Sequence, residues 1–69
     1  MTAKQFRAML AKLDMSQRGM ARLFKCNERT ARRYSRGELK VPHDIVENLH
    51  KLANGTVTVE DIERAYAHR

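Results

Sequence analysis

A chain of 69 residues has room for one domain with a small hydrophobic core, and 42% hydrophobic with 32% charged residues is typical of a soluble globular protein rather than a disordered tail. No apolar run is long enough to cross a bilayer, the first residues lack the apolar segment of a secretion signal, and the single cysteine, Cys26, excludes an internal disulfide, so we expect a cytoplasmic protein. The formal net charge of +6 comes from fourteen Lys and Arg against eight Asp and Glu residues, and it favours an anionic partner.

The positive charge is confined to one segment. Between Ser16 and Lys40 there are eight cationic and two acidic residues, so this segment alone carries +6, while the remainder has six charges of each sign. Basic charge concentrated in this way is typical of proteins that bind a nucleic-acid backbone. A basic solvated face that keeps a small domain soluble is the alternative interpretation.

The first predicted helix spans residues 3–13. Thr2 followed by Gln5 has the form of a capping box, in which a hydroxyl and an amide each satisfy an unpaired backbone N–H group. Apolar residues then recur at the spacing of one helix face. They are Phe6, Met9, Leu10 and Leu13.

Two short helices are predicted next, over residues 17–24 and 28–35. Ser16 and Asn27 are their expected N-caps, and Gly37 is the expected terminator of the second. The inward residues are expected to be Met20, Ala21, Leu23 and Phe24 on the first, with Ala31, Tyr34 and Thr30 on the second and Cys26 filling an apolar position under the turn.

Two further helices are predicted in the second half of the chain. Pro42 pre-sets the first turn of the fourth helix, Asn54 and Gly55 end it, and Thr58 caps a fifth helix over residues 59–67. Their apolar sides are Ile45, Val46, Leu49, Leu52 and Ala53 on the fourth and Val59, Ile62, Ala65 and Tyr66 on the fifth. Strand signals are weak, so we expect an all-α fold of four to five helices.

The second and third helices, short and separated by only a few residues, have the arrangement of a helix-turn-helix. With Ala31 and Tyr34 facing inward, the opposite face of the third helix carries one acidic residue and four arginines. Such a row of like charges is suited to a DNA groove, where phosphates lie on both sides. The face consists of Glu28, Arg29, Arg32, Arg33 and Arg36.

The segment SQRGMARLFKCNERTARRYSRGELKVP, residues 16–42, resembles the Cro/C1-type (lambda-repressor-like) helix-turn-helix family. The family pattern has Ser-Gln, an inward aliphatic–Ala pair, a polar cap, a Thr, an Arg–Trp pair, a Gly and a Pro. The matching residues here are Ser16, Gln17, Met20, Ala21, Asn27, Thr30, Arg33, Tyr34, Gly37 and Pro42. The resemblance covers residues 3–53, and small phage-type repressors, including anti-CRISPR-associated autorepressors, are similar.

Two positions depart from the family pattern. Lys25 stands where a turn glycine is usual, and if its backbone is left-handed it is strained by about 1 kcal/mol. Tyr34 stands where Trp is usual, and it fills less volume but adds a hydroxyl. Neither change removes a functional group.

The resemblance assigns roles to the exposed residues, because the start of the third helix meets base edges in the major groove of such proteins. The implied base contacts are Asn27, Glu28, Arg29 and Arg33. The implied phosphate contacts are Ser16, Gln17, Arg18, Lys25, Arg32, Arg36 and Lys40. Two roles stay open: Glu28 either accepts from a cytosine amine or only serves the helix dipole, and Arg22 either contacts DNA or pairs with an acidic residue elsewhere.

The expected function is that of a sequence-specific double-stranded DNA-binding transcriptional regulator, a repressor acting as a homodimer on an inverted-repeat operator, its own promoter included. Residues 1–55 form the DNA-binding part, and residues 56–69 either pack on the first and fourth helices or meet a second copy. Candidates for that dimer contact are Val57, Val59, Ile62 and Tyr66. The alternatives are an RNA-binding translational repressor and an antitoxin-like protein-interaction adaptor.

No enzyme activity, metal, cofactor or small-molecule effector is expected. Ser16 and Ser35 have no paired base and acid in register, and a small core leaves little room for a substrate cleft. The histidines His43, His50 and His68 lack the spacing of a metal site. Cys26 is better explained as an apolar filler than as a redox sensor.

Overall fold

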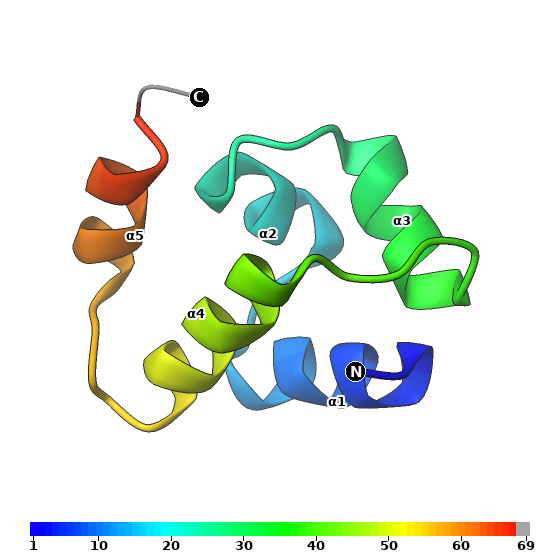
Figure 1. The fold of residues 1–69 in the computed structure, drawn as a ribbon, viewed down its shortest axis with the longest axis horizontal. Helices are drawn as coiled ribbons and strands as arrows, with labels where there is room; N and C mark the ends of the chain where they lie inside the picture. The colour runs from blue at the N-terminus through cyan, green and yellow to red at the C-terminus, as the bar shows by residue number, and fades with distance from the viewer. Residues whose placement is uncertain (68–69) are drawn as a thin grey trace.

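The computed structural model describes residues 1–67, which form five α-helices (Figure 1). They are α1 (Ala3–Lys12), α2 (Gln17–Leu23), α3 (Glu28–Arg36), α4 (His43–Ala53) and α5 (Val59–Ala65). None of the described residues lies in a strand, so the chain is all-α, and the helix bounds agree with the predicted ones to within two residues. Over residues 1–67, no helix has both the length and the apolar character needed to span a membrane.

The predicted N-caps are confirmed. Thr2 and Gln5 form the complete capping box at the start of α1. The Ser16 hydroxyl accepts from the backbone N–H of the third residue of α2 at 2.9 Å, and the Asn27 side chain accepts from the N–H of Arg29 at 2.7 Å. Each contact satisfies a backbone donor that the helix itself leaves unpaired.

Four helices are followed, within two positions, by a residue with positive φ: Asp14, Lys25, Gly37 and Gly55. In all four turns the N–H of the following residue donates to the carbonyl five residues back at 2.9 Å, which is the Schellman arrangement. The two glycines adopt this conformation freely, whereas Asp14 (φ 54°) and Lys25 (φ 55°) carry a Cβ that makes it unfavourable. The left-handed turn considered for Lys25 is therefore present, and the one at Asp14 was not predicted.

All five helices contribute to one hydrophobic core. The largest side chains at its centre are almost completely buried: Phe6, Met20, Phe24, Ile45, Leu49 and Ile62. α3 lies against α1 and α2, and the ring of Tyr34 meets that of Phe6 edge-on with 5.8 Å between centroids. The inward side of α3 is therefore Ala31 and Tyr34, as predicted, together with Ser35.

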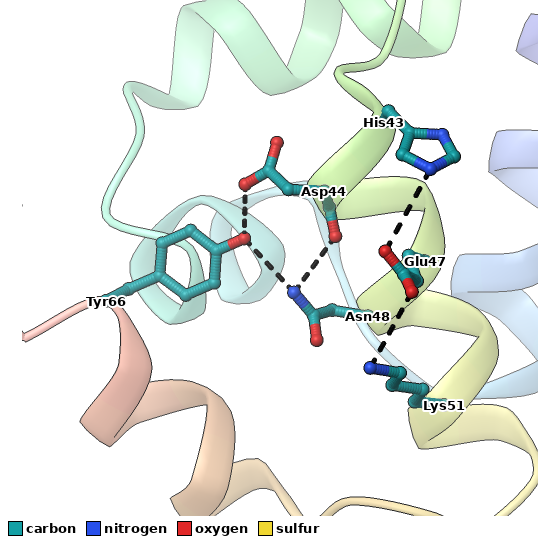
Figure 2. Close-up of polar contacts among 6 residues, drawn as sticks. All are labelled: His43, Asp44, Glu47, Asn48, Lys51 and Tyr66. Carbon is teal, nitrogen blue, oxygen red and sulfur yellow. Dashed lines mark hydrogen bonds and ion pairs between the residues drawn. The ribbon is translucent and has the colours of Figure 1, made fainter.

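α5 packs on α2 and, through Tyr66, reaches α4. Of the two partners considered for α5 in a single chain, the first and fourth helices, the contact with the fourth is present, while the packing on α2 was not expected. The ring of Tyr66 lies edge-on to Phe24 with 5.1 Å between centroids. Its hydroxyl donates to Asp44 Oδ2 at 2.5 Å and accepts from Asn48 Nδ2 at 3.3 Å (Figure 2). Tyr66 therefore joins three helices.

Part of the predicted apolar side of α5 is wrong. Val59 is 48% exposed, and Ala65 is also exposed. α5 has only seven residues, so one pair at i and i+4, Ile62 and Tyr66, is enough to fill its contact with the core.

Candidate nucleic-acid interface

α3 lies at one side of the molecule, next to α2 and above α1 in the view of Figure 1. Because the buried side chains of α3 lie on one face, the positions i, i+4 and i+7 occupied by Arg29, Arg33 and Arg36 fall on the opposite, solvent-facing side. Arg32 flanks this stripe. All four arginines are exposed, so the outward face predicted from the sequence is confirmed.

An ion pair joins α2 to the start of α3. Arg18 Nε lies 3.5 Å from Glu28 Oε2, with both side chains well exposed. Exposed pairs of this kind contribute at most about 1 kcal/mol. Glu28 is the first residue of α3, where its charge also suits the helix dipole, so the contact with Arg18 is a role that the sequence did not indicate.

A second acidic residue lies beyond the other end of α3. Glu38 Oε1 is 3.6 Å from Arg33 Nε, and Glu38 Oε2 is 3.9 Å from Arg36 Nη1. No ion pair involving Arg29 or Arg32 is found within residues 1–67. The arginine face thus divides into two side chains that share one carboxylate and two that have no acidic partner.

The candidate phosphate contacts do not all lie together. Ser16, Gln17 and Arg18, at the start of α2, line one hollow with Glu28 and with residues of α1. The other members of that hollow include Arg7, Leu10, Ala11, Met15 and Ser35. Lys25 lies at the opposite end of α2 and Lys40 lies in the segment between α3 and α4, so neither adjoins this hollow.

Lys25 borders a different hollow, between α2 and α5. Arg22 lies there too, with Val59 and Glu63. The described residues include no acidic partner in an ion pair with Arg22, so the pairing considered for it is not formed.

Sequence reasoning missed Arg7. Its guanidinium Nη1 donates to the backbone carbonyl of Ser35 in the last turn of α3. A cation at this end of a helix interacts favourably with the helix dipole, so the contact ties α1 to α3. The Ser35 hydroxyl is buried and has no hydrogen-bond partner among residues 1–67. No local pattern marks Arg7, because the contact spans 28 positions in sequence.

Two of the four candidates for the dimer contact are buried in the core of the folded chain. Ile62 is 2% and Tyr66 is 8% exposed, so a second copy could reach neither while α5 stays folded against the core. Val57 is half-buried. Val59 is the one large hydrophobic side chain within residues 1–67 that is exposed.

Of the residues considered for other chemistry, Ser16 and Cys26 have structural contacts, and His43 lies at the surface near a carboxylate. The Ser16 hydroxyl caps α2, Cys26 is half-buried against the core, and His43 Nε2 lies 4.0 Å from a Glu47 oxygen. His68 lies outside the described residues. Within residues 1–67 no three His, Cys, Asp or Glu side chains are grouped so that they could hold a metal ion.

The carboxyl group of Asp61, in the capping box of α5, has a lowered pKa. Hydrogen bonds from the backbone N–H of Thr58, and then from its side chain, hold the pKa of Asp61 below its usual value of 3.8. Thr58 N lies 2.9 Å from Asp61 Oδ2, and the Asp61 N–H returns a bond to the Thr58 hydroxyl at 3.2 Å. The pair fixes the start of α5, which lies on the opposite side of the molecule from α3 in the view of Figure 1.

Comparison of the chain with protein-family models, with curated proteins and with solved structures finds no match. A function must therefore be inferred from the residues and their geometry. What they provide is a pair of short helices, α2 and α3, joined by four residues, with a basic face on the second helix.

Proposed function

We propose that the chain is a sequence-specific double-stranded DNA-binding protein of the lambda-repressor-like helix-turn-helix type, which regulates transcription by repression. One observation carries the proposal: α3 is held by its inward face while Arg29, Arg33 and Arg36 form a stripe on the outward face. Burying the inward face leaves the arginine side chains available to a polyanion.

The dimensions of α3 suit this role. Nine residues at 1.5 Å each give a helix about 14 Å long, and the major groove, about 12 Å wide, admits an α-helix. In the proposed orientation Arg29 and Arg33 meet base edges, because Arg can donate two hydrogen bonds to O6 and N7 of guanine. Arg32 and Arg36, together with Arg18, contact phosphates and supply affinity that does not depend on sequence.

The proposed unit is a homodimer on an inverted repeat. One copy of α3 contacts too few bases to select a site among many, and two copies related by a twofold axis contact half-sites about 10 bp apart, or a multiple of that. With Ile62 and Tyr66 in the core, Val57 and Val59 are the remaining candidates for the contact between copies. Such a dimer represses in the cytoplasm by occupying a promoter, its own among the candidates.

Selection of bound duplexes from a random pool tests this function. The expected result is enrichment of an inverted repeat, whose symmetry also reports the number of copies bound. A variant with Arg29→Ala and Arg33→Ala is the control, and it should enrich no motif because both proposed base contacts are removed.

Three outcomes would count against the proposal. No enrichment by the wild-type protein would exclude sequence-specific DNA binding. Preference for a structured RNA over duplex DNA in competition would favour a translational repressor. Capture of one stoichiometric protein partner, without binding to any duplex, would favour an adaptor.

A further inference from the structure

Among residues 1–67, Glu38 is the one acidic residue in an ion pair with the outward arginines Arg33 and Arg36, and the proposed interface assigns it no role. We propose that Glu38 is a positioning residue for base recognition, which holds Arg33 through its Nε atom and thereby raises the preference for the cognate site over other DNA. This inference rests on the proposed function, since it concerns how α3 distinguishes one duplex from another.

The turn after α3 places Glu38 against Arg33. Gly37 has a left-handed backbone (φ 78°), and it turns the chain back so that the N–H of Glu38 donates to the carbonyl of Arg33 at 2.9 Å. Oε1 of Glu38 then lies 3.6 Å from Nε of Arg33. The turn therefore fixes the backbone of Glu38 against Arg33, and the carboxylate lies within ion-pair distance of the Arg33 guanidinium.

The atom that Glu38 engages leaves the rest of the guanidinium available. Arg has five N–H donors, of which Nε carries one and the two terminal nitrogens carry four. The terminal nitrogens of Arg33 can therefore donate to guanine O6 and N7 while Nε remains near the carboxylate. A long side chain that is already held in one orientation loses less conformational freedom when it binds.

The charge of Glu38 keeps binding to all DNA low. A carboxylate at the edge of the arginine face repels the phosphates of any duplex, whatever its sequence. The benefit of an oriented Arg33 appears only where a guanine lies opposite. Arg32, a proposed phosphate contact with no acidic partner among residues 1–67, attracts all DNA alike. Glu38 therefore lowers background binding more than it lowers cognate binding.

Glu38→Gln tests the inference, with affinities measured for the selected duplex and for a random duplex at several salt concentrations. The random duplex should bind more tightly, and the ratio of the two affinities should fall about fivefold, the upper range for an exposed ion pair. Glu38→Asp keeps the charge but shortens the side chain, so it should leave random binding unchanged and still lower the ratio.

Glu47→Gln is a matched control on α4. Its carboxylate also contacts two cationic groups, Lys51 Nζ at 3.8 Å and His43 Nε2 at 4.0 Å (Figure 2). The Glu47 side chain is 55% exposed, close to the 49% of Glu38. Removing this charge should change both affinities by the same factor and leave their ratio unchanged.

A double variant locates the effect. In an Arg33→Ala background, Glu38→Gln should no longer change the ratio, because the side chain that Glu38 orients is gone. An unchanged ratio in Glu38→Gln alone, or an equal fall with and without Arg33, would overturn the inference. These results are separate from a failure of the proposed function, in which the wild-type protein prefers no duplex and its ratio is one.

Discussion

Replacing Lys25 with glycine should make the protein more stable. The left-handed backbone of Lys25 (φ 55°) costs about 1–2 kcal/mol for a residue with a Cβ and nothing for glycine. Glycine also gains freedom in the unfolded chain, which offsets about 0.4–1 kcal/mol of that benefit. The side chain is exposed, so no core contact is lost. We expect the free energy of unfolding to rise by about 0.5–1 kcal/mol, which raises Tm by about 2–8 °C in a domain of this size.

Thermal unfolding followed by circular dichroism measures this change. Lys25→Ala is the control, because it removes the same charge but keeps a Cβ in the left-handed backbone. If Lys25→Gly proved no more stable than Lys25→Ala, the argument from backbone strain would be refuted. Both variants should also reduce the salt dependence of DNA binding by about 0.9 in the logarithmic slope, since each removes one proposed phosphate contact.

Five further substitutions test other parts of the molecule. Arg33→Ala should remove most sequence preference, whereas Lys40→Ala should weaken binding to all duplexes equally and flatten the salt slope by about one unit; equal losses on selected and random duplexes would contradict these roles. Tyr66→Phe removes the hydroxyl that joins α5 to α4, so urea unfolding should show a loss of about 1–2 kcal/mol. Val59→Asp should convert the proposed dimer to monomers in analytical ultracentrifugation while thermal stability stays within about 0.5 kcal/mol, and a persisting dimer would exclude Val59 from the interface. Because the pKa of Asp61 is lowered, its carboxylate stabilises the fold fully above the unfolded-state pKa of 3.8, and this stabilisation is lost as the pH falls through the lowered pKa. The free energies of unfolding of wild type and Asp61→Asn should therefore differ at neutral pH and converge in acid.

The starts of the helices could be predicted because capping is local. A side-chain oxygen at Thr2, Ser16 or Asn27 needs only a backbone N–H two or three residues further on. The same holds for the outward direction of the arginines, which follows from the burial of Ala31 and Tyr34 on a regular helix. Neither prediction depends on how the helices are arranged in space.

The position of α5 could not be predicted in the same way. An apolar pattern shows which face of a helix is buried, but it does not say which helix that face meets. Tyr66 is fixed by Asp44, 22 positions earlier, and by the ring of Phe24. In a helix of two turns, those contacts left Val59 and Ala65 in solvent.

The ion pairs at the arginine face were likewise beyond sequence reasoning. The contact between Arg18 and Glu28 depends on how α2 and α3 cross. The contact between Arg33 and Glu38 depends on the left-handed turn at Gly37. Gly37 was expected to end the helix, but the sequence did not indicate that the turn would bring a carboxylate back to it. Exposed charges have many possible partners at similar cost, so spacing alone does not select one.

The contact between Tyr66 and Phe24 bears on any attempt to isolate a smaller DNA-binding fragment. Phe24 comes directly before the left-handed turn that leads into α3, and the ring of Tyr66 covers it. A peptide ending at residue 55 would retain every arginine of α3 yet expose the Phe24 ring to water and release the turn that sets the angle of α3. The last helix is thus a remote support for the arginine face, and shortening the chain would disturb that face without removing any of its proposed DNA contacts.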